Sequence, residues 1–508
     1  MGERLNRLIG LPLRYPWATL MILMIGTAVL STIALSKQSL RLDEAQSLFQ
    51  ASRSPLAIFS VVAEDVHVPL YHQLLHFWQL FFGNGIASAR ILSMGFFLAT
   101  IPTVYILGKR VFGQGVGLFA ASLFAISPFM NWYGNEIRMY TLLTLMSVLS
   151  HYFFLRIYRG AGRRSWLGYA ISAVLGIYSH YFFFFVLLTQ AVFFILRRSD
   201  FPKRSFRKFI GVAVFLAAMF APWLTYVQSL GSASNTKPNL PVPDSTDVFS
   251  TLAQFLFGFP NDRLNALILS LWPISILLGF LALRARRRIP SEMLYFLLAA
   301  TLPILGAFVV SIVYNPVYLT RYLIISLPPL YLLLSWLIDG YARKLRIGVQ
   351  TALVAVMLLM LGFQTVSDRV PVKEDYRAAA EWLNVHASPQ DVVVVSAPFT
   401  VYPIEYYYTG PARLETLPIW DRTVSGAIPA FDPATLPQQV SELGKQHRYA
   451  YVILSQDQGY QEEIRQYYER NFQRVTQVQL SPGLSLQAYQ MSYSLPNLTY
   501  QPVSTLGP

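Results

Sequence analysis

The 508-residue chain has no cysteine and few charged residues. The absence of cysteine excludes disulfides, thiolate nucleophiles and cysteine-ligated zinc, and it leaves the redox compartment undecided. Only 13% of the residues are charged, whereas 54% are hydrophobic and 15% aromatic, and the mean hydropathy is +0.42. This composition is too apolar for an ordinary soluble protein and predicts a polytopic α-helical membrane protein.

The formal net charge is +14, but the basic excess is confined to one part of the chain. Residues 1–367 contain 30 Lys and Arg against 12 Asp and Glu, whereas residues 368–508 contain 10 against 14. Cytoplasmic loops of membrane proteins carry such an excess. The charge therefore requires no nucleic-acid partner, and we expect none.

Eleven apolar runs of about 17 to 22 residues are long enough to cross a bilayer. The first run covers residues 17–36, and we interpret it as a retained helix because no small-residue cleavage site clearly follows it. The other runs centre near residues 98, 121, 147, 172, 188, 217, 272, 302, 329 and 356.

The loops between these runs alternate in basic charge, with 22 Lys and Arg in one set and eight in the other. By the positive-inside rule the N-terminus is cytoplasmic. An odd number of spans then places the chain beyond residue 367 outside. We therefore expect a multi-pass protein of the plasma (inner) membrane with an extracytoplasmic C-terminal part.

Two outer segments are long, 37–90 and 227–263, and the pattern changes beyond the last apolar run. In residues 368–508, "KEDYRAAAEWLNVHA" and "EEIRQYYERNF" have helical periodicity, and "DVVVVSAP" and "RYAYVILSQD" are typical of strands. Alternating helices and strands predict a small α/β domain of about 130 residues. The remaining residues, 1–367, form the predicted membrane domain.

No apolar run carries a charged residue near its middle, which weighs against an ion-coupled carrier, because carriers usually hold ionisable groups at the membrane midplane. The charged and hydrogen-bonding groups collect instead at the outer ends of the helices. This distribution predicts a site at the outer membrane surface. The groups are Asp43 and Glu44; Glu64, Asp65 and His67; "NWYGNEIRMY" (131–140); "YSHY" (178–181); and "NPVYLTRY" (315–322).

The acidic groups and His67 also have purely structural interpretations. Asp43 and Glu44 can cap a helix, since acids favour helix N-termini and "DEAQSLF" is typical of a helix start. His67 can be a hydrogen-bonded interfacial histidine. Asp65 and His67 form a metal site only with a third ligand, so no cofactor is predicted and a divalent metal stays open.

The cationic groups have structural interpretations as well. Glu136 and Arg138 flank a helix start and can pair with each other. Arg321 can be a snorkelling anchor that keeps its charged head at the interface.

Several motifs occur in an order that resembles one enzyme family. They are Asp-Glu-Ala after the first run, "HVPLYHQLLHFWQLFFGNGIASARILS", "SPFMNWYGNEIRMY", "YSHYFFFF" and "RYLIISLPPL", over roughly residues 40–335, followed by "DYRAAAEWL" and "DVVVVSAP" in the tail. Together they resemble the bacterial branch of the protein O-mannosyltransferase-like glycosyltransferases of the GT-C superfamily, which includes enzymes that move sugars onto lipid A or lipopolysaccharide cores. One departure is Val68, where the family has a second proline.

The resemblance implies an integral-membrane inverting glycosyltransferase, either hexosyl or pentosyl. It would take a sugar from a polyprenyl-phosphate-linked donor and pass it to a hydroxyl of a lipid, glycan or protein acceptor on the non-cytoplasmic face, among membrane lipids. Its fold would be a GT-C membrane domain of about 11 transmembrane helices with a C-terminal extracytoplasmic α/β domain.

The chemistry of such a transfer assigns roles to the residues above. A carboxylate must take the proton of the acceptor hydroxyl, which we assign to the pair Asp43 and Glu44, with Asp43 as the base by resemblance. Cationic groups must hold the departing phosphate, which we assign to Arg321 and Arg138. The remaining residues of the predicted substrate cavity are Asp65, His67, Tyr71, Tyr133, Glu136, His180, Tyr181 and Tyr322.

Two alternative functions stay open. A lipid-linked sugar flippase or other transporter is disfavoured by the uncharged helix interiors. A polysaccharide polymerase or O-antigen ligase works on the same face, but the early Asp-Glu pair and the α/β tail would be unexpected in it.

Overall fold

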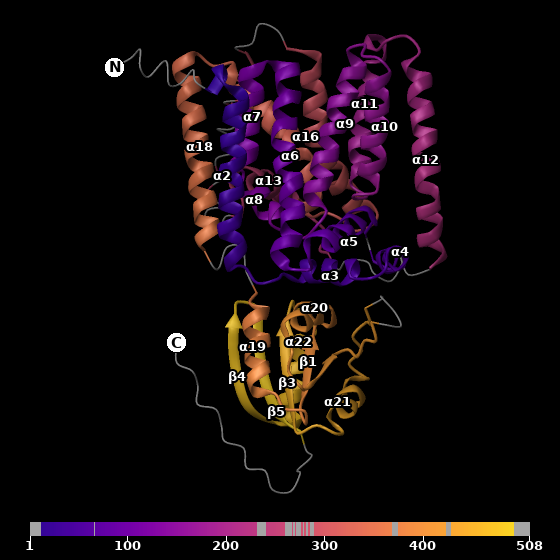
Figure 1. Cartoon of the computed structure of the whole chain (residues 1–508), viewed down its shortest axis with the longest axis vertical. Coiled ribbons are helices and arrows are strands. Elements are labelled where there is room, and N and C mark those ends of the chain that lie inside the picture. The colour runs from indigo at the N-terminus through magenta and orange to yellow at the C-terminus, as the bar shows by residue number, and fades with distance from the viewer. Residues whose placement is uncertain are drawn as a thin grey trace. The chain divides into compact units, whose positions relative to one another are not determined.

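The computed structural model describes residues 12–65, 67–230, 240–259, 289–367, 374–422 and 428–491, with short helical pieces between 267 and 284. The chain forms two compact units (Figure 1). The helical unit comprises Met1–Lys37 and Arg53–Val370, and the C-terminal unit comprises Gln38–Ser52 and Pro371–Pro508. Segment 38–52 was expected within the first outer loop of the membrane domain. It belongs instead to the C-terminal unit.

Long apolar helices make up most of the helical unit, where they stand side by side (Figure 1). They coincide with ten of the eleven apolar runs; the run near residue 272 lies largely outside the described residues. Their bounds are α2 (Pro16–Lys37), α6 (Ile86–Phe112), α7 (Gln114–Ile126), α9 (Tyr140–Tyr158), α10 (Arg163–Ile177), α11 (Phe183–Leu196), α12 (Ser205–Ser229), α16 (Ser291–Val313), α17 (Leu327–Asp339) and α18 (Arg343–Val366).

The number of spans differs from the expected eleven. Within the described ranges, six helices are long and apolar enough to cross a membrane: α6, α9, α12, α16, α18, and α17 together with the 3-10 helix η3 (Thr320–Ser326). A seventh follows if α7 and α8 (Pro128–Gly134), which bend by 59° at their junction, form one span. Helices such as α10 and α11 are shorter than their apolar runs because turns at their ends consume residues. The count of eleven is therefore not confirmed.

The bend between α7 and α8 has a local cause. Proline disfavours a helical conformation in the residue before it, and Ser127, which precedes Pro128, is extended with φ −58° and ψ 121°. The Ser127 hydroxyl accepts a hydrogen bond from the backbone N–H of Met130 at 3.2 Å, so it caps α8. The chain thus leaves the α7 axis just where the polar stretch 131–140 begins.

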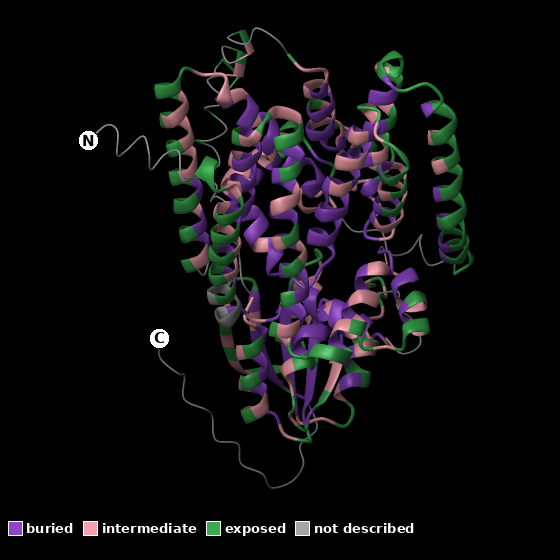
Figure 2. Ribbon diagram, turned by 45° about the horizontal axis from the view of Figure 1, so that its top comes forward, coloured by how far each residue is buried: buried purple, intermediate pink, exposed green. Residues whose placement is uncertain are grey.

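Shorter elements complete the helical unit. They are α4 (Pro55–Ala63), α5 (Leu70–Phe82), the 3-10 helix η1 (Arg198–Asp200) and α13 (Ser245–Phe257). Burial separates the long helices into two groups (Figure 2): α9 is mostly buried, whereas α12 and α18 expose most of their apolar side chains. Exposed apolar helix faces are expected where the surrounding medium is lipid.

Helices α6 and α7 approach each other closely through glycines. A Cβ atom at Gly108 would meet Gly117 Cα and Leu332 Cδ2 at 2.6 Å. Small residues allow this kind of backbone contact between membrane helices, where no hydrophobic driving force exists.

The C-terminal unit is built on a five-stranded sheet in the order β2-β1-β3-β5-β4. Strand β1 is parallel to β2 and β3, and β5 is antiparallel to β3 and β4. All residues of β1 and β3, the two strands expected from the sequence, are buried. The elements are α19 (Tyr376–His386), β1 (Val392–Ser396), the 3-10 helix η4 (Pro398–Thr400), α20 (Val401–Tyr407), β2 (Arg413–Thr416), α21 (Leu436–Gly444), β3 (Tyr449–Ser455), α22 (Gln461–Asn471), β4 (Gln473–Ser481) and β5 (Leu484–Gln490).

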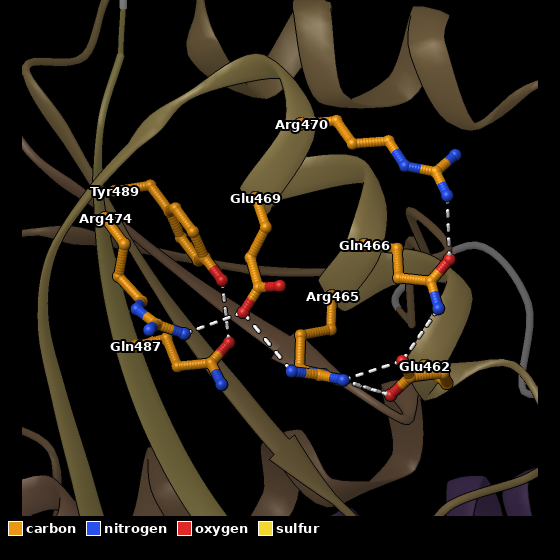
Figure 3. A network of polar contacts seen from close by, with 8 residues as sticks. All are labelled: Glu462, Arg465, Gln466, Glu469, Arg470, Arg474, Gln487 and Tyr489. Carbon is orange, nitrogen blue, oxygen red and sulfur yellow. Dashed lines mark hydrogen bonds and ion pairs between the residues drawn. The ribbon is translucent and has the colours of Figure 1, made fainter.

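Helix α22 covers this sheet through an apolar face and a polar edge. Ile464 and Tyr468 are buried in the core cluster with Val452 of β3. On the outer side, the Glu469 carboxylate accepts hydrogen bonds from Arg465 at 3.3 Å and from Arg474 of β4 at 2.7 Å (Figure 3). The polar contacts therefore tie the helix to the edge strand, while apolar burial supplies most of its stabilisation.

Helix α3 (Leu42–Ala51) packs against α20. The rings of Phe49 and Tyr402 lie 4.8 Å apart between centroids. Just before the helix, the backbone N–H of Leu40 donates to the hydroxyl of Tyr407 at 2.9 Å. The buried apolar face of α3 is the reason why segment 38–52 folds with the C-terminal unit.

Candidate active site

Polar segments that are distant in the sequence meet at one end of the helical unit. The backbone N–H of Leu70, the first residue of α5, donates to the carbonyl of Tyr178 at 3.2 Å, which joins α5 to the turn between α10 and α11. In the same turn, the His180 ring lies 4.8 Å from the ring of Tyr322 in η3. Three of the predicted outer helix ends therefore form one site.

His67 is held by contacts on two sides. Its Nε2 lies 3.7 Å from the Asp65 carboxylate. Its backbone carbonyl accepts a hydrogen bond from the Tyr181 hydroxyl at 3.4 Å, and that hydroxyl accepts one from the indole N–H of Trp223 on α12 at 3.1 Å. Asp65, His67 and Tyr181, all predicted cavity residues, are thus brought together, with Trp223 as a support that the sequence did not suggest.

His72 is a further member of this cluster that the sequence analysis missed. It lies on the first turn of α5, it is fully buried, and its ring stacks 6.2 Å from that of His67. Burial is the main cause that lowers the pKa of His72 to about 3, and the neighbouring His67 and Arg138 add to this effect. The imidazole is therefore neutral at physiological pH. The repeated histidine in "HVPLYH" was the signal that could have identified it.

Arg138 lies in the bent stretch between α8 and α9 and is 3% exposed. The hydroxyl of Ser93 on α6 donates to its carbonyl at 3.4 Å, and the Tyr71 hydroxyl lies 2.6 Å from the same serine hydroxyl. The backbone N–H of Arg138 donates to the carbonyl of Glu136, which is also buried. Charged side chains are seldom so deeply buried unless they are paired or serve a site.

Aromatic rings surround His180 on the inner side of the site. The ring of Tyr140 lies 6.4 Å from His180 and 6.3 Å from Tyr322, and the ring of Tyr133 lies 5.1 Å from Tyr140. Tyr140, the first residue of α9, was not among the predicted cavity residues. It is the residue that joins the 131–140 stretch to the other two segments.

Two guanidinium groups act on the same imidazole. Burial is the main cause that lowers the pKa of His180 to about 3, and the neighbouring His67, Arg138 and Arg321 add to this effect in that order. The guanidinium of Arg321 lies 5.6 Å above the ring of Tyr322. Arg138 and Arg321 therefore both lie near His180, in a cluster that also contains the acids Asp65 and Glu136.

The segment that carries Arg321 is fixed by α13. The hydroxyl of Thr251 on α13 lies 2.9 Å from the Tyr318 hydroxyl and 3.1 Å from that of Thr320. These hydrogen bonds fix the start of η3, and therefore the backbone from which the side chains of Arg321 and Tyr322 extend. Of the second outer segment expected at 227–263, residues 231–239 and 260–263 lie outside the described part of the chain.

The acidic pair belongs to the C-terminal unit, where its two members differ. Glu44 is fully buried, and its carboxylate accepts a hydrogen bond from the backbone N–H of Arg41 at 3.0 Å. It therefore caps the N-terminus of α3, as the structural interpretation of the pair expected. Asp43 is only partly buried. The side chains of adjacent helical residues point in different directions, so the two acids cannot have the same role.

Glu374 is a third carboxylate in the same unit, and the sequence analysis missed it. Burial raises its pKa; the nearby charge of Arg41 opposes this effect, and that of Asp43 adds to it. Its carboxylate accepts a hydrogen bond from the side chain of Gln456. Asp43 thus has a neighbouring acid that is about 330 residues away in the sequence.

The described residues contain no group of three His, Cys, Asp or Glu side chains arranged to hold a metal ion. In that part of the structure, Asp65 and His67 are therefore not joined by a third ligand of these types. The predicted roles of Asp43, Glu44, Arg138 and Arg321 stay predictions, since geometry alone assigns no chemistry to them.

Comparisons with known proteins agree with this architecture. Residues 66–226 match the family described as dolichyl-phosphate-mannose-protein mannosyltransferase. The crystal structure of ArnT from Cupriavidus metallidurans in the apo state is similar with a TM-score of 0.62 at 13% sequence identity, over 92% of this chain and 97% of that one. The structure of ArnT bound to undecaprenyl phosphate gives 0.62 at 15% identity, over 95% and 100%. A comparison with curated protein sequences finds no match.

The structural matches define the fold of the chain. The chain is mostly helical and has an ArnT-like GT-C fold. The family match within its first half agrees with that fold. The resemblance predicted from the motifs is therefore confirmed.

Proposed function

We propose that this protein is an integral-membrane inverting glycosyltransferase that moves a sugar from a polyprenyl-phosphate-linked donor to an acceptor hydroxyl on the non-cytoplasmic face. The observation that carries the proposal is the pair of arginines at this site: Arg138 is 3% exposed, and Arg321 lies 5.6 Å from the ring of Tyr322, which is itself 4.8 Å from the His180 ring. A phosphate leaving group needs such a cationic site. The structurally similar ArnT has been crystallised with undecaprenyl phosphate, an anionic membrane lipid of this kind.

The proposed reaction is a single displacement. Asp43 takes the proton of the acceptor hydroxyl while the oxygen attacks the anomeric carbon through an oxocarbenium-like transition state. The bond between the anomeric carbon and the phosphate oxygen breaks, and its electron pair leaves with the polyprenyl phosphate. Arg321 and Arg138 stabilise the charge on that phosphate. The transferred sugar and the acceptor class, whether lipid, glycan or protein, are not specified by these groups.

The roles of the two acids are proposed to be unequal. Asp43 is more accessible than Glu44, whose carboxylate is occupied in capping α3. This difference supports Asp43 as the base.

A transfer assay tests the proposal against the transporter alternative. Purified protein is incubated with a polyprenyl-phosphate sugar and a lysate-derived acceptor fraction, and free polyprenyl phosphate is measured. We expect its release to depend on both enzyme and acceptor. A protein that moves intact donor between the leaflets of a vesicle without releasing polyprenyl phosphate would instead be a flippase.

A further inference from the structure

A lengthwise groove lies on the helical unit between α2, α7 and α18, with a volume of about 760 Å³. Helices α2 and α18 both pack on α7 but make few contacts with each other. Helix α7 is thus the floor of the groove and the other two are its walls. Figures 1 and 2 show α2 and α18 side by side at one edge of the bundle.

The walls of the groove are apolar, and the residues that line it recur at the spacing of the helical repeat. The lining residues are spaced three or four apart, so each helix contributes one face. Examples are Ile22, Leu23 and Leu30 on α2, Phe119 on α7, and Val354 and Leu358 on α18. The hydroxyls of Thr27 and Ser122 donate to the backbone carbonyls of Ala125 and Leu118, so they add little polarity to the groove.

The charged groups lie at one end only. Arg343 and Arg346, in the first turn of α18, line the groove there together with Asp339, which ends α17. Arg346 forms an ion pair with Asp339 at 2.8 Å. The groove end therefore carries two guanidinium groups against one carboxylate, beside the N-terminus of a 24-residue helix.

This charged end is remote from the candidate active site. Helix α17 starts directly after η3, which carries Arg321, and ends at Asp339. The positive-inside rule predicts that the Asp339 end faces the cytoplasm. From Arg343 to Leu358 the groove follows α18 for about 22 Å at 1.5 Å per residue. This exceeds half of the roughly 30 Å hydrocarbon core, so a full acyl chain of one leaflet fits along it.

We propose that the groove between α2, α7 and α18 is a binding site for an anionic glycerophospholipid, with an acyl chain between α2 and α18 and the phosphate on Arg343 and Arg346. Within a bilayer, lipid rather than water fills a groove of this size between the described helices, because water is absent from the core. Basic pockets between membrane helices on the cytoplasmic side are suited to anionic headgroups. The bound lipid completes the packing of α18, which otherwise exposes most of its surface.

Gly26 offers a sharp test. It lines the groove midway along α2, and a Cβ atom there would meet no protein atom within 4 Å. Gly26→Phe therefore introduces a bulky ring at a groove position where the added Cβ atom has room. Gly95→Phe is the matched control, because Gly95 is an exposed helical glycine on α6 with equally open surroundings and no part in the groove.

The headgroup is tested by Arg343→Gln, with Arg163→Gln as the control. Arg163 is an exposed arginine at the start of α10 and does not line the groove. Delipidated full-length protein in detergent is titrated with phosphatidylglycerol or phosphatidylcholine, and bound lipid is counted by native mass spectrometry. A thermal unfolding scan of each variant without lipid checks that it is folded.

We expect one saturable site that prefers phosphatidylglycerol. Gly26→Phe should abolish this binding, Arg343→Gln should weaken it about fivefold, and both controls should bind like the wild type. Equal binding of the two lipids, or wild-type binding by a folded Gly26→Phe protein, would overturn the proposal. So would displacement of phosphatidylglycerol by equimolar undecaprenyl phosphate, which would assign the groove to a polyprenyl lipid.

Discussion

Phe49 and Tyr402, from opposite ends of the chain, lie with their rings 4.8 Å apart and inclined by 47°. The guanidinium of Arg422 lies over both rings, 6.0 Å from Phe49 and 5.4 Å from Tyr402, and is paired with Glu405 at 2.6 Å. This cluster fixes α3, and α3 carries the acidic pair. The C-terminal unit is therefore more than a separate accessory, since it holds the helix on which the proposed base lies.

Phe49→Ala should lower the turnover number without changing donor affinity, because it loosens the helix that carries Asp43 but leaves the cationic site intact. An aromatic pair is worth about 0.5 to 1.5 kcal/mol beyond its buried area, which corresponds to roughly a 2- to 10-fold loss. The measurement is kcat and KM for the donor, with hydrogen exchange of residues 42–51. Phe431→Ala is the control, since Phe431 stacks on Tyr460 elsewhere in the same unit. Equal effects of the two variants would refute a specific role for the α3 contact.

Asp43→Asn should abolish most turnover while donor binding and membrane insertion survive, since loss of a general base typically costs about 10² to 10⁴ in rate. Glu44→Gln should be milder in rate, but it should destabilise α3 by about 1 kcal/mol because Glu44 caps the helix. Single-turnover kinetics with pre-bound donor measures the first effect. An inactive Glu44→Gln beside an active Asp43→Asn would reverse the roles, and two active variants would direct the search for the base to Glu64, Asp65 or Glu136.

Arg321→Lys should weaken donor use, and Arg321→Ala should weaken it further. Lysine keeps the charge but loses the planar fork that binds phosphate oxygens in pairs. The donor KM and the Kd for polyprenyl phosphate check this, with exposed Arg163→Lys as the matched replacement outside the site. Wild-type kinetics in Arg321→Ala would reduce the residue to an interfacial anchor.

The buried histidines predict how stability depends on pH. The pKa values of His72 and His180 are lowered from 6.5 to about 3, so the unfolded chain binds more protons than the folded one between these limits. Their stabilising effect is therefore complete above pH 6.5 and is lost as the pH falls, by about 1.4 kcal/mol per pH unit for each histidine. Thermal unfolding between pH 7.5 and 5 should show this slope, and His72→Gln should reduce it. An unchanged slope in that variant would mean that His72 is already charged in the folded protein.

The orientation of the chain is open to a direct test. A reporter that is active only outside the cytoplasm should be active when it is fused after residue 370, and silent in the loop 197–208, which is rich in basic residues. The opposite result would invert the topology, and the proposed active site would then face the cytoplasm.

The helices were predictable because each apolar run carries its own signal of length and composition. The bend between α7 and α8 also has a local cause, Pro128, but it could not be recognised in the sequence because it lies beside a continuous apolar run. The site was partly predictable, since polar residues at helix ends on one face must gather there, as His180, Arg138 and Tyr322 do.

Tyr140 and His72 were missed because both lie in the first turn of a helix, where burial depends on neighbouring elements. The packing of Phe49 on Tyr402 and the approach of Glu374 to Asp43 depend on contacts between distant segments, which one sequence does not encode locally.

The attachment of α3 to the far end of the chain has a consequence for synthesis. A ribosome that has made α3 must still add about 350 residues before α20 exists, which takes roughly 20 to 70 s at 5 to 20 residues per second. During that time α3, which carries Asp43, has left the ribosome, but α20, the helix against which it packs, has not yet been made. An unfinished chain already in the membrane thus lacks a positioned base, and the ability to act would arrive only after α20 has been translated.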